Sequence, residues 1–446
     1  MKALMNFKKK GGNDTSVSFF ESLQVKHTKD FTGQYLNPEN IIYSLANMQQ
    51  LVFEVTDACN LKCKYCAYGE MYEDYDVRED KMLPVEKAIR LIDYLVSFWN
   101  SDRNVSIKKR IYISFYGGEP LLNMTFIKEI VDYVENKLDC PNLQFEFSMT
   151  TNAILLHRYM DYLHEHRVIL LVSLDGNKEN TEYRVDKSGN QAFDRIANNI
   201  DQLREKYPDY FKERVNFNAV LHNKNSVEEI YHFFKDKYDK IPSIGELNNV
   251  GIRKEMQEVF NKTYRNSNES LHQSEHYEKI ERDMFIRSGS YQSVTLFLHQ
   301  YSGYVFKDYM DLLFDRMEQK TLPTGTCTPF SKKMFVTVKG KILPCERIGH
   351  QFALGEITDT EIKLDMEAIA NKYNCYYAKF ENQCSVCKNI KSCVQCMFNV
   401  TDLEEKPICH GYMNEEFFKN YIGAQMYFLE KNPEVYKKIM EEVIVI

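Results

Sequence analysis

Short apolar runs alternate with amphipathic segments along the first half of the chain, and this alternation limits the folds that the chain can adopt. The apolar runs predict strands at 51–55, 111–116, 145–149, 168–173, 215–220 and 243–247. The amphipathic segments predict helices near 84–99, 124–138, 155–165, 191–205 and 226–237. Strands that alternate with helices form βα units and a parallel sheet. Because six such units follow without an obvious reversal, an α/β fold with a partial (β/α)6, TIM-like barrel is favoured over a doubly wound sheet.

Polar or glycine-rich segments follow four of the predicted strands. They are the loop that contains Cys59, "GGEP" at 117–120, "TTN" at 150–152 and "SLDG" at 173–176. In α/β barrels the active site lies on the loops at the carboxyl ends of the strands. We therefore expect these four segments to meet in one site.

The overall composition excludes several classes of function. A formal net charge of -7 over 446 residues gives no reason to expect nucleic acid or an anionic membrane as a partner. The N-terminus lacks the apolar core of a secretory signal, and no stretch is long and apolar enough to span a bilayer. We therefore expect a cytoplasmic protein, in which clustered thiols hold metal more often than they form disulfides.

The sequence "ACNLKCKYC" places Cys59, Cys63 and Cys66 on the loop after the first predicted strand. Thiolates bind zinc, copper(I) or iron–sulfur clusters. A structural zinc site needs four ligands, whereas three thiols on a [4Fe–4S] cluster leave one iron open to the amine and carboxylate of a small cosubstrate. An iron–sulfur cluster is the favoured interpretation, and a zinc site completed by a distant histidine is the alternative.

The CxxxCxxC spacing resembles the signature of the radical S-adenosylmethionine (SAM) enzymes, because Tyr65 precedes the third cysteine and Gly117, Gly118 and Glu119 follow the second strand. The resemblance covers residues 49–250. It implies that the three cysteines hold a [4Fe–4S] cluster whose open iron binds the methionyl part of SAM. It also implies that the GGE segment receives the SAM amino group, since glycines let backbone carbonyls approach a ligand closely. Tyr65 is counted with the cofactor-binding residues.

The same resemblance extends to four further positions. It implies that Ser173 and Arg184 contact the ribose and the carboxylate of SAM, and that Thr151 and Asn152 line the neighbouring part of the site. The planar fork of arginine suits a carboxylate. Plainer alternatives stay open, in which Ser173 only caps a strand end, residues 175–176 form a simple turn, and Arg184 makes a surface ion pair.

The cysteine-rich section at 326–410 resembles the SPASM domain, which carries two auxiliary [4Fe–4S] clusters in radical SAM enzymes that modify peptides. The resemblance implies that one auxiliary cluster is held by Cys384, Cys387, Cys393 and Cys409. It implies that the other is held by Cys327, Cys345 and Cys396. This second set is one thiol short, so Cys375 completes it, or the position is open to a substrate thiol or water. A buried apolar role for Cys375 is the alternative.

Two details qualify this section. Only two residues separate Cys393 from Cys396, where the family usually has three. The remaining cysteine, Cys140, is expected to be structural. The segment 333–344 predicts a β-hairpin that turns at 339–340, and metal clusters are expected to supply much of the folding energy of a section that can bury little apolar surface.

The expected organisation has five parts. They are an N-terminal extension of unassigned role, a radical SAM barrel, a helical bridge, a SPASM-like section and a C-terminal helix, at 1–48, 49–260, 261–325, 326–415 and 416–446.

The combination of both cysteine sections favours a peptide maturase. The resemblance implies that SAM is cleaved reductively and that the 5′-deoxyadenosyl radical removes a hydrogen atom from a ribosomally made precursor peptide, which gains a cross-link or an oxidised residue. A flavodoxin- or ferredoxin-type protein is the expected electron donor.

Three alternatives remain. An anaerobic sulfatase-maturating enzyme would act on a sulfatase segment and form formylglycine. Those enzymes usually carry an aspartate base directly after the cysteine of the Gly-x4-Cys element, and Glu346 occupies that position here as the candidate catalytic residue. A surface ion pair near Arg347 is the plainer role for Glu346. A non-catalytic iron–sulfur electron carrier and a zinc-binding interaction module are the other two classes.

Overall fold

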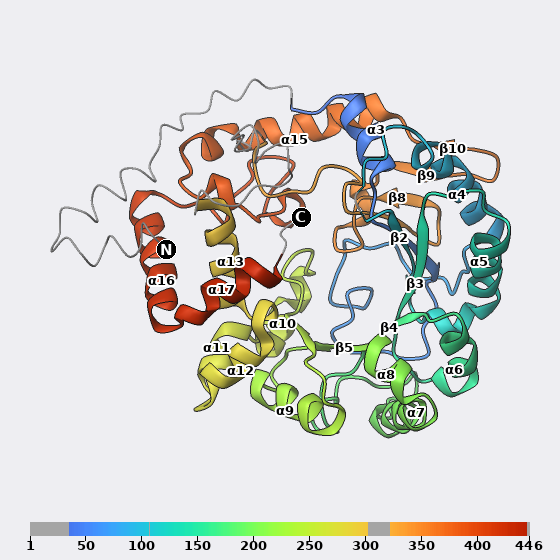
Figure 1. The fold of residues 1–446 in the computed structure, drawn as a ribbon, viewed down its shortest axis with the longest axis horizontal. Coiled ribbons are helices and arrows are strands. Elements are labelled where there is room, and N and C mark those ends of the chain that lie inside the picture. Colours follow the sequence, from blue (N-terminus) through green and yellow to red (C-terminus); the bar gives the residue numbers. More distant parts are fainter. Residues whose placement is uncertain (1–34, 107, 302–321, 444–446) are drawn as a thin grey trace. The chain divides into compact units, whose positions relative to one another are not determined.

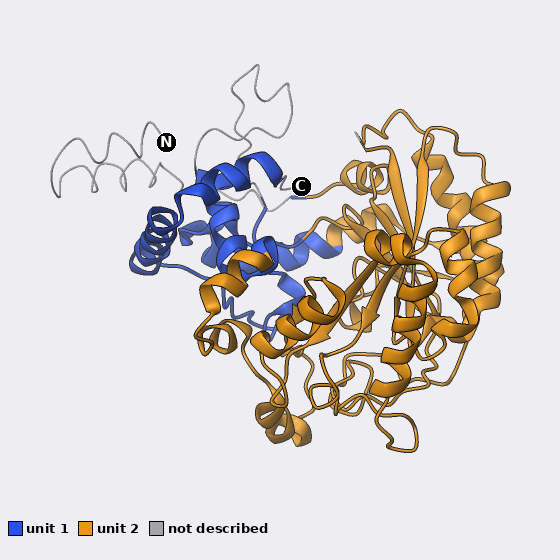
Figure 2. Cartoon of the chain, turned by 60° about the horizontal axis from the view of Figure 1, so that its bottom comes forward, with its two compact units in different colours: residues 1–35, 285–326, 372–446 blue, residues 36–284, 327–371 orange. Residues whose placement is uncertain are grey.

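The computed structural model of the chain describes residues 35–106, 108–301 and 322–443 (Figure 1). The chain divides into two compact units (Figure 2). Of the described residues, the barrel unit contains 36–284 and 327–371, and the helical unit contains Tyr35, 285–301, 322–326 and 372–443. The expected N-terminal extension and helical bridge lie partly outside the described residues, and the five expected domain boundaries remain predictions.

The barrel unit is built on a sheet with the strand order β10-β9-β8-β7-β1-β2-β3-β4-β5-β6. Six neighbouring strands run parallel in the order of the sequence: β1 (Gln50–Thr56), β2 (Arg110–Gly117), β3 (Gln144–Thr151), β4 (Ile169–Ser173), β5 (Val215–Val220) and β6 (Ser243–Gly245). They confirm the six predicted strands. A doubly wound sheet reverses its order at a switch point, so the unbroken order agrees with the expected partial barrel.

Helices connect the parallel strands and lie along the outer side of the sheet (Figure 1). They are α4 (Val85–Trp99), α5 (Met124–Asn136), α6 (Leu156–Glu165), α7 (Phe193–Lys206), α8 (Pro208–Arg214) and α9 (Val227–Tyr238). The five predicted helices are confirmed to within two residues at each end. Helix α8 was not predicted, because its 7 residues are too few to show a helical period.

Helix α4 shows why the sequence alone is enough to predict these helices. Pro84 stands at its N-cap and supplies an extended backbone before the first turn. Leu91, Leu95 and Trp99 recur at intervals of four residues, and all three are buried. This stripe packs the helix onto the sheet.

Strands β7 (Lys333–Val336) and β8 (Lys341–Leu343) form the predicted hairpin, and Gly340 has a φ of +87° in its turn. The sequence did not predict that β7 pairs in parallel with β1. The antiparallel strands β9 (Gly355–Ile357) and β10 (Ile362–Lys363) extend the sheet further. The first part of the cysteine-rich section therefore continues the barrel sheet.

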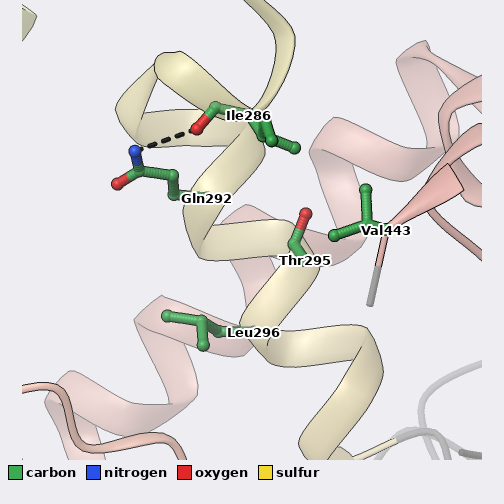
Figure 3. A pocket seen from close by; sticks show the side chains of 5 residues that line it. All are labelled: Ile286, Gln292, Thr295, Leu296 and Val443. Atoms are coloured by element: carbon green, nitrogen blue, oxygen red, sulfur yellow. Dashed lines mark hydrogen bonds between the residues drawn. The ribbon is translucent and has the colours of Figure 1, made fainter. Parts of the chain in front are cut away.

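The helical unit has a core in which α13 (Gly289–Tyr301) packs against α16 (Glu415–Lys431) and α17 (Pro433–Glu442). The predicted C-terminal helix is thus two helices, divided before Pro433. Figure 3 shows a pocket of about 200 Å³ in this unit, where Gln292 donates a hydrogen bond to the Ile286 carbonyl. The pocket is lined by Ile286, Gln292, Thr295, Leu296 and Val443.

The remaining helices are α3 (Pro38–Ala46), α10 (Gln257–Thr263), α11 (Ser267–His272), α12 (Tyr277–Met284) and α15 (Met366–Val386). Single 3-10 turns occur at Pro120–Asn123, Lys254–Met256, Phe285–Arg287, His350–Phe352, Ile390–Ser392 and Met397–Asn399. The sequence did not predict the 21-residue helix α15. Among the described residues, no helix combines the length and the apolar character that crossing a bilayer requires.

Candidate functional site

The ends of β1 and β2 are joined through the backbone of the GGE segment. The Gly118 N–H donates to the Thr56 carbonyl at 2.8 Å, and the Glu119 N–H donates to the Ala58 carbonyl at 2.9 Å. A Cβ at Gly118 would lie 1.9 Å from the Ala58 oxygen. Because only glycine permits this approach, Gly118 and the neighbouring Gly117, whose φ is +130°, place the segment directly against the cysteine loop.

The Glu119 side chain connects the second and third strand ends. Its carboxylate is fully buried and accepts hydrogen bonds from the Leu121 N–H at 3.1 Å, the Thr151 hydroxyl at 2.7 Å and the Asn152 N–H at 2.7 Å. Burial raises the pKa of Glu119 to about 7, although these hydrogen bonds oppose the shift. Since the carboxylate is occupied, the part of the GGE segment left for a cosubstrate amine is its backbone. Binding of the SAM amino group here stays a prediction.

Asn152 extends this connection to the cysteine loop. Its Nδ2 donates to the Asn60 Oδ1 at 2.7 Å and lies 3.7 Å from the Cys59 Sγ. Three of the four expected segments therefore meet at one end of the sheet. The positions of Thr151 and Asn152 agree with the expected convergence, and their contact with SAM stays a prediction.

The thiols of the cysteine loop fit a metal cluster that binds thiolate. Burial raises the pKa of Cys59 to about 11 and that of Cys63 to about 12, and the other two thiols of the loop add to the shift of Cys63. In these buried surroundings a free thiolate is disfavoured because it loses its hydration, whereas a thiolate bound to a metal keeps a partner for its charge. Within the described residues, no three His, Cys, Asp or Glu side chains converge closely enough to bind a single metal ion.

A buried network that the sequence did not predict anchors the middle of this loop. The Tyr65 hydroxyl donates to Asp175, a residue with no exposed surface. Arg184 donates to the same carboxylate from Nε at 3.0 Å and from Nη2 at 2.8 Å, and the Val220 N–H donates at 3.0 Å. Burial alone would raise the pKa of Asp175, but Arg184 and His222 outweigh it and hold the pKa at about 2.

This network corrects two of the plainer alternatives. Arg184 is 5% exposed, so its ion pair is buried and does not lie on the surface. Asp175 is a central acceptor and not part of a simple turn. Two donor positions of Arg184 are committed to Asp175, and its contact with the SAM carboxylate stays a prediction for the other guanidinium hydrogens. Ser173 is the half-buried last residue of β4, and its ribose contact also stays a prediction.

Glu346 follows β8 and lies in the barrel unit with the cysteine loop. Its carboxylate accepts from the Lys333 Nζ at 3.0 and 3.1 Å, and the Cys345 Sγ lies 3.6 Å away. Its side chain is only 16% exposed, whereas Arg347 is 83% exposed and 3.9 Å away. The expected ion pair with Arg347 is thus present at 3.9 Å, but the closer partner of Glu346 is Lys333, and Glu346 itself is largely buried and not on the surface.

Tyr116 on β2 connects Glu346 with the cysteine loop. Burial raises the pKa of the Tyr116 hydroxyl, and the negative charges of Glu346 and Cys66 raise it further. Both groups therefore act on the same half-buried ring. The catalytic role of Glu346 stays a prediction.

Four cysteines gather in the helical unit. Burial raises the pKa of Cys384 to about 12, and the nearby Cys393, Cys409 and Cys387 add to this shift. The Met413 N–H donates to the Cys387 Sγ at 3.5 Å. The four thiols expected to hold one auxiliary cluster thus lie close together.

The other expected cluster is divided between the units: Cys327 and Cys345 belong to the barrel unit, and Cys396 belongs to the helical unit. Its assembly stays a prediction. Cys375 is exposed, so the buried apolar alternative is wrong, while its role as a ligand stays a prediction. Cys140 is buried, and its Sγ lies 3.2 Å from the Asn100 Oδ1, as expected for a structural thiol.

A cavity of about 350 Å³ adjoins the cysteine loop and is lined by Asp57, Cys59, Leu61, Lys62, Arg78, Asp80 and Lys187. The sequence did not predict that Arg78 belongs to the site. It lies in a polar stretch with no period and no motif, and only the folded chain brings it to the thiols. Asp175 left a weak signal, since it is a charged residue at the end of a strand.

Comparison with known proteins agrees with this geometry. Residues 53–236 match the sequence model of the Radical SAM superfamily. A cysteine-type anaerobic sulfatase-maturating enzyme of Clostridium novyi is 27% identical over 43% of this chain and 49% of its own length. The radical SAM cyclopropyl synthase TigE of Paramaledivibacter caminithermalis is 22% identical over 74% of this chain and 66% of its own length. Both alignments span less than two thirds of the relative's length.

A solved structure has the same fold. Native anSMEcpe with bound AdoMet and Cp18Cys peptide superposes with a TM-score of 0.57 at 19% identity, over 88% of this chain and 99% of that chain.

Proposed function

Residues 53–236 form a radical SAM domain, and from this premise we propose that the chain is a peptide maturase. It removes a hydrogen atom from a ribosomally made precursor peptide, which then gains a cross-link or an oxidised residue. A flavodoxin- or ferredoxin-type protein supplies the electrons.

Cys59, Cys63 and Cys66 would hold a [4Fe–4S] cluster, which with SAM supplies the chemistry that abstracts hydrogen from an unactivated C–H bond. The chain's own groups position these partners. Gly117 and Gly118 bring a bare backbone to the cysteine loop, and Glu119 fixes that backbone to the third strand end.

The observation that carries the proposal is the second group of thiols in the same chain. Cys384, Cys387, Cys393 and Cys409 lie close together in the helical unit. They would hold an auxiliary cluster, whose chemistry is one-electron transfer. A barrel site for hydrogen abstraction combined with a separate site for electron transfer suits the oxidation or cross-linking of a peptide. TigE, named as a cyclopropyl synthase, and anSMEcpe, which binds a peptide, support a substrate of this class.

Maturation of a sulfatase is the second candidate. It depends on Glu346, which follows Cys345 where those enzymes usually carry an aspartate, and which lies near Tyr116, as does Cys66. A carboxylate in this place can accept a proton from a substrate. The sulfatase-maturating relative from Clostridium novyi supports the same candidate.

The deciding experiment uses the full chain, reconstituted anaerobically with iron and sulfide and then given SAM and a reductant. One arm receives a candidate short precursor peptide, and the other a sulfatase-derived peptide. We expect 5′-deoxyadenosine and a mass change in the first arm, and both should be lost in Gly118→Trp, which also loses SAM binding by calorimetry. Formylglycine in the second arm would favour the sulfatase candidate. SAM binding without 5′-deoxyadenosine in either arm would count against both candidates, and absence of SAM binding would favour an electron carrier.

A further inference from the structure

Arg78 is a cation placed against the thiols of the cysteine loop. It is half-buried, and its Nη2 lies 3.9 Å from the Cys66 Sγ. Its guanidinium lies over the Tyr68 ring, 4.5 Å from the ring centre. Its Nε is buried and has no hydrogen-bond partner among the described residues. Arg78 also lines the cavity that contains Cys59, and its charge acts against the rise in the pKa of that thiol. One guanidinium therefore lies beside Cys66 and acts on Cys59 as well.

The backbone around Arg78 is fixed to the end of β1. The Asp57 carboxylate accepts from the Glu79 N–H at 3.0 Å and the Lys81 N–H at 2.6 Å. The Leu83 N–H donates to the Val55 carbonyl at 3.1 Å. The segment directly after Arg78 therefore runs antiparallel to β1, and the position of Arg78 follows from the sheet and not from a free loop.

The charge of Arg78 is not neutralised by a direct partner, unlike those of nearby cations. Lys62 pairs with Glu70 at 2.9 Å, and Arg184 pairs with Asp175 at 2.8 Å. Across the described ranges, no carboxylate oxygen lies within 4.0 Å of the Arg78 nitrogens. Its positive charge acts both on the buried Glu54 carboxylate and on the Cys59 thiol, so it reaches the sulfur atoms of the loop.

We propose that Arg78 is a positioning residue that raises the reduction potential of the first cluster by holding a positive charge beside Cys66 and Cys59. The inference rests on the proposed function, because it requires a cluster on this loop. A cluster held by thiolates becomes more negative when it accepts one electron, and a nearby cation stabilises that reduced form. Net charge and hydrogen bonds to sulfur set the potentials of such clusters. The electron comes from the added reductant, and no bond forms or breaks.

The test is a redox titration of the anaerobically reconstituted full chain, followed by electron paramagnetic resonance. The signal of the first cluster is the one that disappears in Cys63→Ala. In Arg78→Gln we expect the ratio of reduced to oxidised cluster at a fixed potential to fall about tenfold, which equals a lowering of the reduction potential by about 59 mV for one electron. Arg78→Lys keeps the charge and should stay near the wild-type potential. The matched control is Lys62→Gln, which lines the same cavity but is 68% exposed and should leave the potential unchanged.

Two results would overturn the role of Arg78. One is a wild-type potential in Arg78→Gln, and the other is an equal lowering in Arg78→Gln and Arg78→Lys, because a structural effect does not depend on charge. If Arg78→Gln binds less iron, Arg78→Lys decides: a wild-type potential supports the proposal, and a lowered one contradicts it. If the wild-type chain has no signal that Cys63→Ala removes, the proposed function fails together with this inference, whereas an unshifted potential removes only the role of Arg78.

Discussion

Asp175→Asn is the sharpest test of how the barrel unit holds its cysteine loop. The Asp175 carboxylate is buried and receives both donors of the Arg184 fork, the Tyr65 hydroxyl and the Val220 N–H. Asparagine has nearly the same shape but no charge. The variant therefore leaves the Arg184 guanidinium buried without a counter-charge, while the size of the side chain is kept.

The expected loss of stability can be bounded from two sides. The pKa of Asp175 is lowered from 3.8 to about 2 in the folded chain, and a shift of this size corresponds to about 2 kcal/mol of unfolding free energy at neutral pH. Removing one partner of a buried ion pair typically costs about 3–5 kcal/mol. We therefore expect Asp175→Asn to lower the unfolding free energy by about 2–5 kcal/mol at pH 7.

The assay is denaturant unfolding of the reduced, metal-free chain, followed by the fluorescence of Trp99. This is the single tryptophan of the sequence, and it is buried in α4 of the barrel unit. The control is Asp161→Asn, which removes a pair with Lys206 whose side chains are 68% and 51% exposed. Exposed pairs contribute little, so the control should change the midpoint far less.

The pH dependence gives an independent check on the sign. Because the folded pKa of Asp175 lies below the unfolded value, its contribution is fully present above pH 4 and is lost as the pH falls toward 2. The difference between wild type and Asp175→Asn should thus be constant from pH 7 to about 4 and shrink below that. A loss no larger than that of Asp161→Asn at pH 7 would refute the reasoning.

Three further outcomes are expected. Gly118→Ala should abolish SAM binding by calorimetry, because its Cβ would lie 1.9 Å from a backbone oxygen, whereas Gly423→Ala has nothing within 4 Å and should bind normally. Glu54 is buried with a pKa raised from 4.5 to about 7, so relative to Glu54→Gln the wild type should lose about 3 kcal/mol of unfolding free energy as the pH rises from 4.5 to 7. An equal pH dependence in both proteins would contradict this. Cys409→Ser should bind about four fewer irons than wild type by metal analysis, while the structural Cys140→Ser should bind the wild-type amount.

The sequence predicted well the features that depend on local periodicity. Ile92, Leu95 and Trp99 recur at helical spacing within one helix, and this spacing alone predicts the buried face on which all three lie. The place of the GGE segment beside the cysteine loop could also be predicted, because a parallel sheet brings the ends of successive strands to the same edge. These signals need no knowledge of distant contacts.

Other features depend on contacts between residues that lie far apart in the sequence, and the spacing of residues does not predict such contacts. The contact of Val338 with Glu54 spans 284 residues, and no periodic pattern connects the hairpin to the first strand. Asp175 and Arg78 were missed for a related reason. Each is one charged residue in a polar segment, and its role comes from partners that the fold supplies.

The contacts of Glu346 weigh on the choice between the two candidate functions. A general base needs a free oxygen within hydrogen-bond reach of the proton that it accepts. Lys333 contacts both carboxylate oxygens of Glu346, at 3.0 and 3.1 Å, and Cys345 lies beside one of them. Lys333 belongs to β7, which pairs with β1. The ion pair therefore links Glu346, and with it the neighbouring Cys345, to the strand that precedes the first cysteine loop. Burial would raise the pKa of Glu346, but Lys333 outweighs it and lowers the pKa, so the ion pair weakens Glu346 as a base. An enzyme that depends on a base at this position would therefore have to overcome the effect of Lys333 on Glu346.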